Sequence, residues 1–149
     1  MEMAEEQPVP ESIENEFARI WPAHVENFTW HLVQCRRHFS GDMDRLLVLC
    51  VIGDRTLAAR NVPDTLKSSD LGNTNVPKEP INLQSIADFS GIPRETVRRK
   101  LQDLTALGWV ERDERGNFAA TQKAAADLAP LTEIAIKYLA KMKAYISPE

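Results

Sequence analysis

The sequence of 149 residues has little cysteine and no long apolar run, and both absences narrow the classes of protein to which it can belong. Its two cysteines, Cys35 and Cys50, are too few for a disulfide-rich secreted scaffold or a four-cysteine zinc site. The longest nearly apolar stretch, residues 46–53, is far too short to cross a membrane. The N-terminus is acidic, whereas a signal peptide begins with a basic segment followed by an apolar one. We therefore expect a cytoplasmic protein that does not enter a membrane.

The sequence also lacks the motifs that mark common catalytic sites. It has no glycine-rich phosphate loop, no His-Glu-x-x-His pair and no Gly-x-Ser-x-Gly turn. His24, His31 and His38 are spaced by seven residues, so on one helix successive rings lie about 10.5 Å apart along the axis. One metal ion cannot bridge that distance. We therefore expect no enzymatic activity, no metal site and no other cofactor.

An excess of positive charge is likewise missing. The chain has 18 basic and 22 acidic residues and a net charge of −4. This balance argues against a nonspecific nucleic-acid coat, because a positive excess supplies the affinity of such proteins. The acidity is concentrated in residues 1–40, with three basic and seven acidic side chains, whereas residues 41–121 have eleven and twelve. A local basic surface in the middle of the chain remains compatible with this distribution.

Both ends of the chain have apolar residues at helical spacing. A first pattern starts at Glu11, and Pro22 is expected to interrupt it and to begin a second helix. Residues 122–146 are expected to form a helix that Pro130 breaks or kinks. After Pro130, one apolar face comprises Leu131, Ile134, Tyr138, Leu139, Met142, Tyr145 and Ile146.

A further helix is expected after residue 41, with Asp42 or Asp44 as its N-cap. It is apolar nearly all round and should therefore be the buried central helix. Its Cys50, like Cys35 in the preceding helix, is expected to be buried because both lie in apolar helical stretches. Residues 60–80 contain three prolines and few large apolar side chains, which predicts a long connecting loop.

The most informative stretch is 80–121. Asn82 is a good N-cap for a short helix, and Gly91 can adopt the left-handed conformation of a sharp turn. Pro93 suits the start of the next helix, and Gly108 is typical of a helix C-terminus. Two short helices joined by a glycine turn form a helix-turn-helix.

A β-hairpin is expected directly after these helices. Residues 109–112 and 118–121 have the pattern of two short strands, and Gly116 lies in the turn at 113–117. Ile81 is placed to add a short third strand. Helix, turn, helix and hairpin make the winged-helix arrangement. The sequence therefore predicts a mainly α fold with a small β-wing.

Bacterial winged helix-turn-helix regulators have a DNA-binding core that resembles the segment LQSIADFSGIPRETVRRKLQDLTALGWVERDERGNFAAT. The layout, with helices before and after this core, is similar to the multiple-antibiotic-resistance-regulator (MarR) type. The terminal helices of that family build a two-fold dimer. The resemblance implies an N-terminal tail and dimerisation helices at 1–40, a DNA-binding domain at 41–121 and a C-terminal dimerisation helix at 122–149.

The second helix of the motif carries the residues expected to recognise DNA. It has four basic and two acidic side chains, and its outward face lies in the major groove when a helix-turn-helix binds DNA. Arginine can donate two hydrogen bonds to guanine, and glutamine can pair in the same way with adenine. Arg98, Arg99 and Gln102 are therefore candidates for base recognition, while Thr96 and Lys100 are better placed for phosphates.

The resemblance and the hairpin complete the candidate interface. In the MarR-type family, the residues matching Arg94, Thr96, Arg98 and Arg99 are the usual contacts. The hairpin adds two arginines that can reach the backbone or minor groove, with the one beside the turn favoured. The complete set of predicted DNA-binding residues is Arg94, Thr96, Arg98, Arg99, Lys100, Gln102, Arg112 and Arg115.

Two functional hypotheses follow. The first is a homodimeric, sequence-specific regulator of transcription whose partner is double-stranded DNA, with a small-molecule effector left open. The second is a winged-helix module that binds other proteins without touching DNA, which the acidic net charge also fits. The plainest alternative for the basic helix is a solvated face on which Glu95 pairs with Arg99 at i, i+4.

Overall fold

A computed structural model describes residues 8–56, 63–70 and 79–147. The chain forms two compact units, one from residues 1–38 and 130–149 and the other from residues 39–129. The predicted loop at 60–80 falls partly outside the described residues; within its described part, a short 3-10 helix, η2, spans Ser68–Asp70. None of the helices in the described ranges is long and apolar enough to span a membrane.

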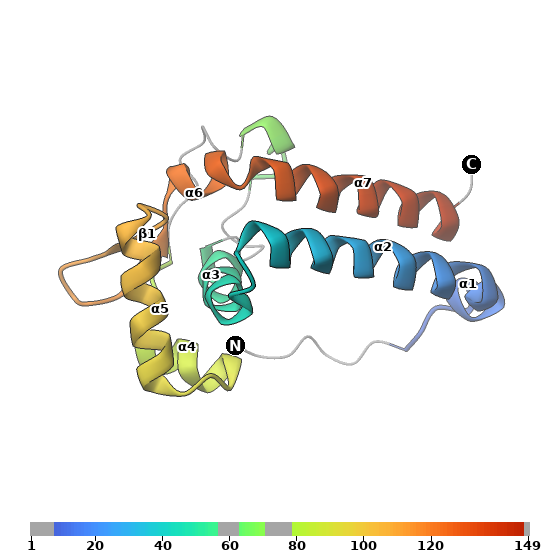
Figure 1. Cartoon of the computed structure of the whole chain (residues 1–149). Helices are drawn as coiled ribbons and strands as arrows, with labels where there is room; N and C mark the ends of the chain where they lie inside the picture. Colours follow the sequence, from blue (N-terminus) through green and yellow to red (C-terminus); the bar gives the residue numbers. More distant parts are fainter. Residues whose placement is uncertain (1–7, 57–62, 71–78, 148–149) are drawn as a thin grey trace. The chain divides into compact units, whose positions relative to one another are not determined.

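The described part of the first unit contains the helices α1 (Glu11–Asn15), α2 (Phe17–His38) and α7 (Ala129–Ile146). Helices α2 and α7 run side by side in opposite directions (Figure 1). Their contact buries Ile20 and Ala23 of α2 against Met142 of α7. The hydroxyl of Tyr138 lies 2.5 Å from Nδ1 of His24, and the Arg19 guanidinium donates to the Tyr145 carbonyl at 2.8 Å. Part of the apolar face expected on the last helix therefore packs against α2 of the same chain.

Pro22 does not begin a new helix, so that expectation was wrong. Helix α2 runs without interruption from residue 17 to residue 38, and Pro22 lies in its second turn. The break falls upstream, at Glu16 between α1 and α2. Proline deprives the helix of one backbone hydrogen bond. Packing of the neighbouring Ile20 and Ala23 on α7 offsets this loss, since tertiary contacts supply most helix stability in proteins.

The expected break near Pro130 is confirmed. Helix α6 ends at Asp127 and α7 begins at Ala129, so Pro130 lies in the first turn of α7. A missing backbone N–H has no cost in the first turn, because the N–H groups there have no partner within the helix.

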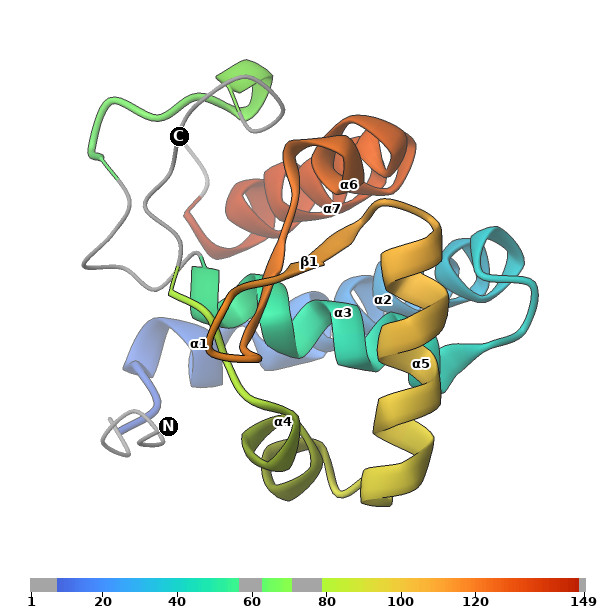
Figure 2. The same cartoon turned by 90° about the vertical axis from the view of Figure 1, so that its left-hand side faces the viewer.

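The second unit contains the winged core. It comprises α3 (Met43–Thr56), α4 (Leu83–Ser90), α5 (Arg94–Ala106), β1 (Val110–Arg112), β2 (Phe118–Ala120) and α6 (Gln122–Asp127). Figure 2 shows α4, α5 and the hairpin arranged around α3. The N-cap of α3 is Asp42, whose Oδ1 accepts from the Arg45 N–H at 2.9 Å. The largest fully buried side chains of this core are Phe39, Val48, Ile52, Ile86, Val97, Leu101 and Leu104.

Helix α3 is central but not buried on all sides, which corrects two expectations. Val48, Val51 and Ile52 are buried, whereas Leu47 is 42% exposed. Cys50 is exposed, while Cys35 of α2 is buried as expected. An apolar sequence on every side of a helix therefore does not ensure burial, because α3 packs on the other elements of its unit through one face only.

The hairpin is confirmed, and the expected third strand is reduced to a single bridge at Ile81. Strands β1 and β2 are antiparallel, with Val110 opposite Ala120 and Arg112 opposite Phe118. Ile81 forms a bridge with Phe118, and the two residues exchange backbone hydrogen bonds of 2.9 and 2.8 Å. The fold is thus mainly α with a small antiparallel wing.

Candidate nucleic-acid interface

The turn between α4 and α5 has the geometry that its sequence predicts. The Asn82 side chain caps α4 by accepting from the Ser85 N–H at 2.8 Å. Gly91 adopts a left-handed conformation with φ of 73°, which other residues rarely adopt. Pro93 is the N-cap of α5, so the second helix starts at Arg94, three residues after the glycine. These local features set the direction in which α5 leaves α4.

The C-terminus of α5 is fixed equally firmly. Gly108 has φ of 76°, and its N–H donates to Thr105 while the Trp109 N–H donates to Leu104, each at 3.0 Å. This pair of bonds is the Schellman arrangement that satisfies the last carbonyls of a helix. The Thr121 hydroxyl then donates to the Gly108 carbonyl at 2.6 Å. Helix α5 is therefore held at both ends, and its outward side chains project from a rigid support.

A second contact at this end, which the sequence analysis missed, involves Trp109. Its indole N–H donates to the Asp127 carboxylate of α6 at 2.8 Å. The hydrogen bond from Lys123, followed by that from Trp109, lowers the pKa of Asp127 below its ordinary value. The one signal in the sequence for this contact is that Asp127 is an acidic residue in an otherwise alanine-rich segment. Trp109 thus links the start of the wing to α6.

Helix α5 buries one face and exposes the predicted recognition face. Val97, Leu101 and Leu104 are buried. Four of the predicted residues are exposed on the helix, and two, Thr96 and Lys100, are half-buried. The exposed four are Arg94, Arg98, Arg99 and Gln102. The structure therefore brings most of the predicted residues of this helix to one accessible surface.

An ion pair on this surface differs from the one considered from the sequence. Glu95 binds Arg98 at i, i+3 and not Arg99 at i, i+4. The Arg98 Nε donates to the Glu95 Oε2 at 2.9 Å, and a second guanidinium nitrogen donates to Oε1 at 2.5 Å. The hydrogen bond from Arg98, together with the nearby arginine charges, lowers the pKa of Glu95 below its ordinary value. Arg94 and Arg99 form no ion pair with any residue that the structure describes.

Lys100 is engaged within the core unit. Its ammonium donates to the Asp42 carboxylate at 2.9 Å, and Arg45 lies on the same carboxylate. Partial burial of Asp42 raises the pKa of its carboxyl, but the hydrogen bonds from Lys100 and Arg45 and their charges outweigh burial and hold the pKa below its ordinary value. The pair spans 58 positions of sequence and ties α5 to the N-terminus of α3. Lys100 therefore has a structural partner that sequence spacing could not reveal.

This pair predicts a pH-dependent contribution to stability. Because the folded pKa of Asp42 lies below the unfolded value, the contribution is present above the unfolded pKa and is lost as the pH falls through the folded pKa. The Asp42→Asn variant keeps a capping oxygen but has no charge. We expect urea unfolding to show it less stable than wild type at pH 7, by about 1 kcal/mol. The difference should shrink as the pH falls below about 4 and reach its minimum only below the lowered folded pKa, where the carboxyl is protonated in both states.

A double-mutant cycle provides the control for this prediction. In a Lys100→Met background, the Asp42→Asn change should cost less stability at pH 7, since the main partner is gone. An Asp42→Asn cost that stays the same at pH 7 and pH 3 would contradict the assignment of the pair.

The wing owes its shape to a few residues of its turn. The Asp113 Oδ1 accepts from the backbone N–H groups of Arg115 and Asn117 at 2.8 and 2.9 Å. Gly116 has φ of 81°, and a Cβ at this position would lie 3.1 Å from the Arg112 guanidinium. That guanidinium also lies over the Phe118 ring, 5.7 Å from its centroid. Both arginines are exposed, but the Arg112 side chain lies along the wing over Phe118, whereas Arg115 lies in the turn.

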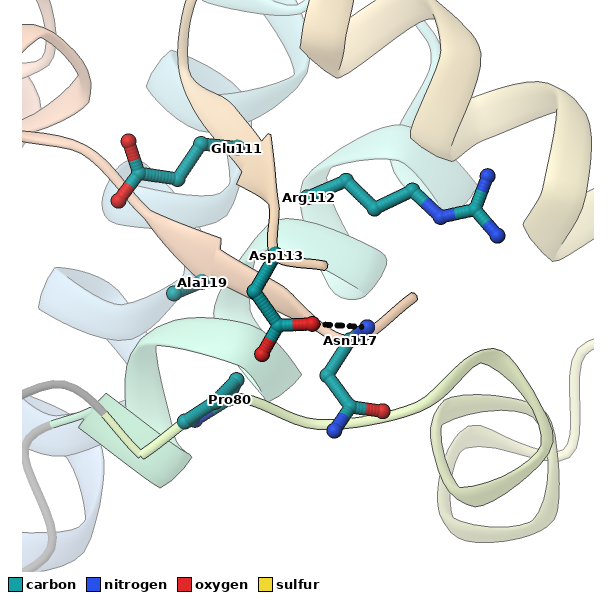
Figure 3. Close-up of a pocket in the computed structure, with 6 residues that line it drawn as sticks. All are labelled: Pro80, Glu111, Arg112, Asp113, Asn117 and Ala119. Carbon is teal, nitrogen blue, oxygen red and sulfur yellow. Dashed lines mark hydrogen bonds between the residues drawn. The ribbon is translucent and has the colours of Figure 1, made fainter. Parts of the chain in front are cut away.

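A small hollow of about 230 Å³ lies beside the wing (Figure 3). Its lining residues are Pro80, Glu111, Arg112, Asp113, Asn117 and Ala119. Figure 3 shows the side chains of Glu111 and Arg112 leaving β1 on opposite sides, as alternation along a strand requires. The Asp113 carboxylate in this hollow already holds the turn. The residues around the hollow therefore serve the shape of the wing.

These features together define a winged helix-turn-helix domain with a basic, exposed second helix. Residues 78–114, about a quarter of the chain, match the family model of the IclR helix-turn-helix domain. The match supports a DNA-binding regulator of transcription of the bacterial helix-turn-helix kind, and it does not support the MarR type in particular. No curated protein and no solved structure matches the chain.

Proposed function

We propose that this protein is a homodimeric, sequence-specific regulator of transcription that acts in the cytoplasm. The observation that carries the proposal is the row of exposed polar and basic side chains on α5, the second helix of the motif. A helix in this position lies in the major groove, where arginine and glutamine can recognise base edges. The domain match at 78–114 supports the same class of function.

The contacts divide by position on the domain. Arg98, Arg99 and Gln102 are proposed to meet bases, because they are exposed along α5. The wing is proposed to lie along the backbone with its turn at the minor groove. The proposed DNA-contacting set remains Arg94, Thr96, Arg98, Arg99, Lys100, Gln102, Arg112 and Arg115, of which Lys100 has to share its charge with Asp42.

The proposed dimer presents two such helices to successive turns of the duplex, about 34 Å apart. The terminal helices hold the two chains together, as the layout of the MarR type suggested. The exposed apolar side chains of α2 and α7 support this role for them, because a contiguous apolar surface needs a partner.

Selection from random duplex DNA tests the proposal. The purified protein at near-physiological salt should enrich an inverted repeat with half-sites about one helical turn apart. Weak retention that depends steeply on salt and enriches no sequence would contradict sequence-specific binding. That outcome would favour the winged-helix module that binds other proteins.

The Glu95–Arg98 pair makes a second prediction about DNA binding. The carboxylate of Glu95 holds Arg98 and places a negative charge on the proposed recognition surface. Glu95→Gln should therefore raise the affinity for random duplex DNA several-fold, because it removes a charge that repels phosphates and releases an arginine. Titrations by fluorescence anisotropy at two salt concentrations would measure the change.

Asp103→Asn is the matched control, since it removes one exposed carboxylate from the same helix. Among the described residues, Asp103 forms no ion pair with an arginine. The gain for Glu95→Gln should exceed the gain for Asp103→Asn. Equal gains would show that only net charge matters and that the pairing of Arg98 has no part in it.

A further inference from the structure

An apolar stripe runs along α2. Its five large side chains are between 39% and 50% exposed, and a histidine ring lies among them. Phe17, Trp21, His24 and Phe28 form a continuous row, with ring centroids 5.6, 5.2 and 5.4 Å apart. At 100° per residue these positions fall within about 100° of the helix circumference. The stripe consists of Phe17, Trp21, His24, Val25, Phe28 and Leu32.

The stripe continues onto α7. Ile20 and Ala23 form the face of α2 that packs on α7, and the centre of the stripe lies about a third of a turn further round the helix. Helix α7 has a similar exposed set, rotated in the same direction from the face that packs on α2. It consists of Ile136, Leu139 and Ile146, which are between 38% and 62% exposed. Because the two helices are antiparallel, equal rotation in the same sense places both sets on one side of the pair. The first unit therefore has one broad apolar face.

The two ends of this face carry opposite charges. Glu11 and Glu14 lie in α1, and no basic residue accompanies them there. Arg36 lies in the last turn of α2 at the edge of the stripe, whereas Arg37 stacks over Trp30 on the opposite side of the helix. No charged side chain belongs to the stripe between these ends. An antiparallel copy of the same face would place acidic beside basic, whereas a parallel copy would place like charges together.

The spacing of the stripe has the same symmetry. Its intervals of 4, 3, 1, 3 and 4 residues are identical in both directions along the helix. A two-fold axis between His24 and Val25 therefore places Phe17 against Leu32 of a second copy and Trp21 against Phe28. Two-fold interfaces require this self-complementarity.

We infer that α2 pairs with α2 of a second copy of this chain in an antiparallel register, with the two-fold axis between His24 and Val25. The inference deepens the homodimer of the proposed function by naming its surface, direction and register. It rests on the exposed stripe, the symmetric spacing and the opposite charges of the two ends.

Disulfide cross-linking in full-length protein tests the register. In a background with Cys35→Ala and Cys50→Ala, each variant carries one engineered cysteine. Val25→Cys should form a disulfide-linked dimer under mild oxidation, because residues near the axis approach their own copies. Phe17→Cys alone and Leu32→Cys alone should stay monomeric on a denaturing gel, whereas a mixture of the two should form the mixed dimer.

The other arrangements predict different patterns. A parallel pair would cross-link Phe17→Cys with itself. A face covered by the chain's own winged core, or by a different protein, would give no cross-linked dimer at any of these positions. Either of these two results would overturn the inference.

Charge reversal provides a second measurement that does not depend on cysteine variants. Changing Arg36 to glutamate should weaken the dimer several-fold in sedimentation experiments, and adding Glu14→Lys should restore it. Lack of restoration would contradict the antiparallel direction.

The DNA selection and the cross-linking test the function and the interface separately. An enriched inverted repeat without a Val25→Cys cross-link would contradict this interface and still support the proposed function. A Val25→Cys cross-link without an enriched repeat would contradict the proposed function and still support the interface.

Discussion

Replacing Arg98 and Arg99 together by alanine should abolish specific DNA binding while leaving the protein folded. Both side chains are exposed on α5, so their removal leaves no cavity. A well-placed arginine contact to a guanine contributes about 1–3 kcal/mol of discrimination. Losing two such contacts should weaken binding to the selected operator about a hundredfold or more. Anisotropy titrations with that operator would measure the loss, and circular dichroism would verify the fold.

The matched control is Lys67→Ala with Lys137→Ala, which removes two exposed positive charges at other places. This variant should lose only the small part of the affinity that arises from net charge. If the arginine variant keeps wild-type affinity, or if both variants lose the same amount, α5 is not the recognition helix. The comparison therefore separates specific contacts from general electrostatics.

Leu104→Ala should produce a large loss of stability. The Leu104 side chain is completely buried in the winged core. Truncating a buried leucine to alanine costs about 2–5 kcal/mol, since apolar contacts are lost and a cavity remains. Urea unfolding at one fixed protein concentration should show a lower midpoint with an unchanged slope. The fixed concentration matters because a change in dimerisation would alter the apparent stability.

Leu107→Ala serves as the comparison for the same chemical change. Leu107 lies three residues further along and is 40% exposed. Its truncation should cost less than about 1 kcal/mol, as is usual for surface positions. Similar losses at the two positions would show that the end of α5 is not packed on the core as described.

Much of the winged core could be predicted because its signals are local. Asn82 caps the helix that follows it, and Gly91 and Gly108 adopt the left-handed conformations for which glycine is best suited. The hairpin was recognisable from two short strand patterns around a glycine turn, and the Ile81 bridge from its position beside them. Each of these features depends on a few neighbouring residues, so one sequence suffices to find it.

Features that depend on tertiary contacts were predicted less well. Proline propensity favoured a break at Pro22, but packing against α7 keeps that helix continuous. Hydrophobicity suggested that Cys50 is buried, but α3 packs through one face and leaves Cys50 on the other. The local sequence pattern indicates which secondary structure a segment favours, whereas its burial depends on which elements surround it.

The candidate site shows the same division. Periodicity was enough to identify the outward face of α5, because the buried positions of a helix fix the exposed ones. It could not show that Glu95 binds Arg98 in preference to Arg99, since both spacings are compatible with a helix. Nor could it reveal that Lys100 binds Asp42, because that contact joins distant parts of the chain.

The construction of the wing bears on how such a protein can diverge. Asp113 and Gly116 determine the shape of the turn, one through its carboxylate and the other through its backbone conformation. Arg115 contributes only its backbone N–H to that shape, and the side chains of Glu114 and Arg115 are exposed. Mutation can therefore alter both side chains while the loop keeps its conformation. Over evolutionary time, this arrangement separates sequence change at the wing tip from selection on folding.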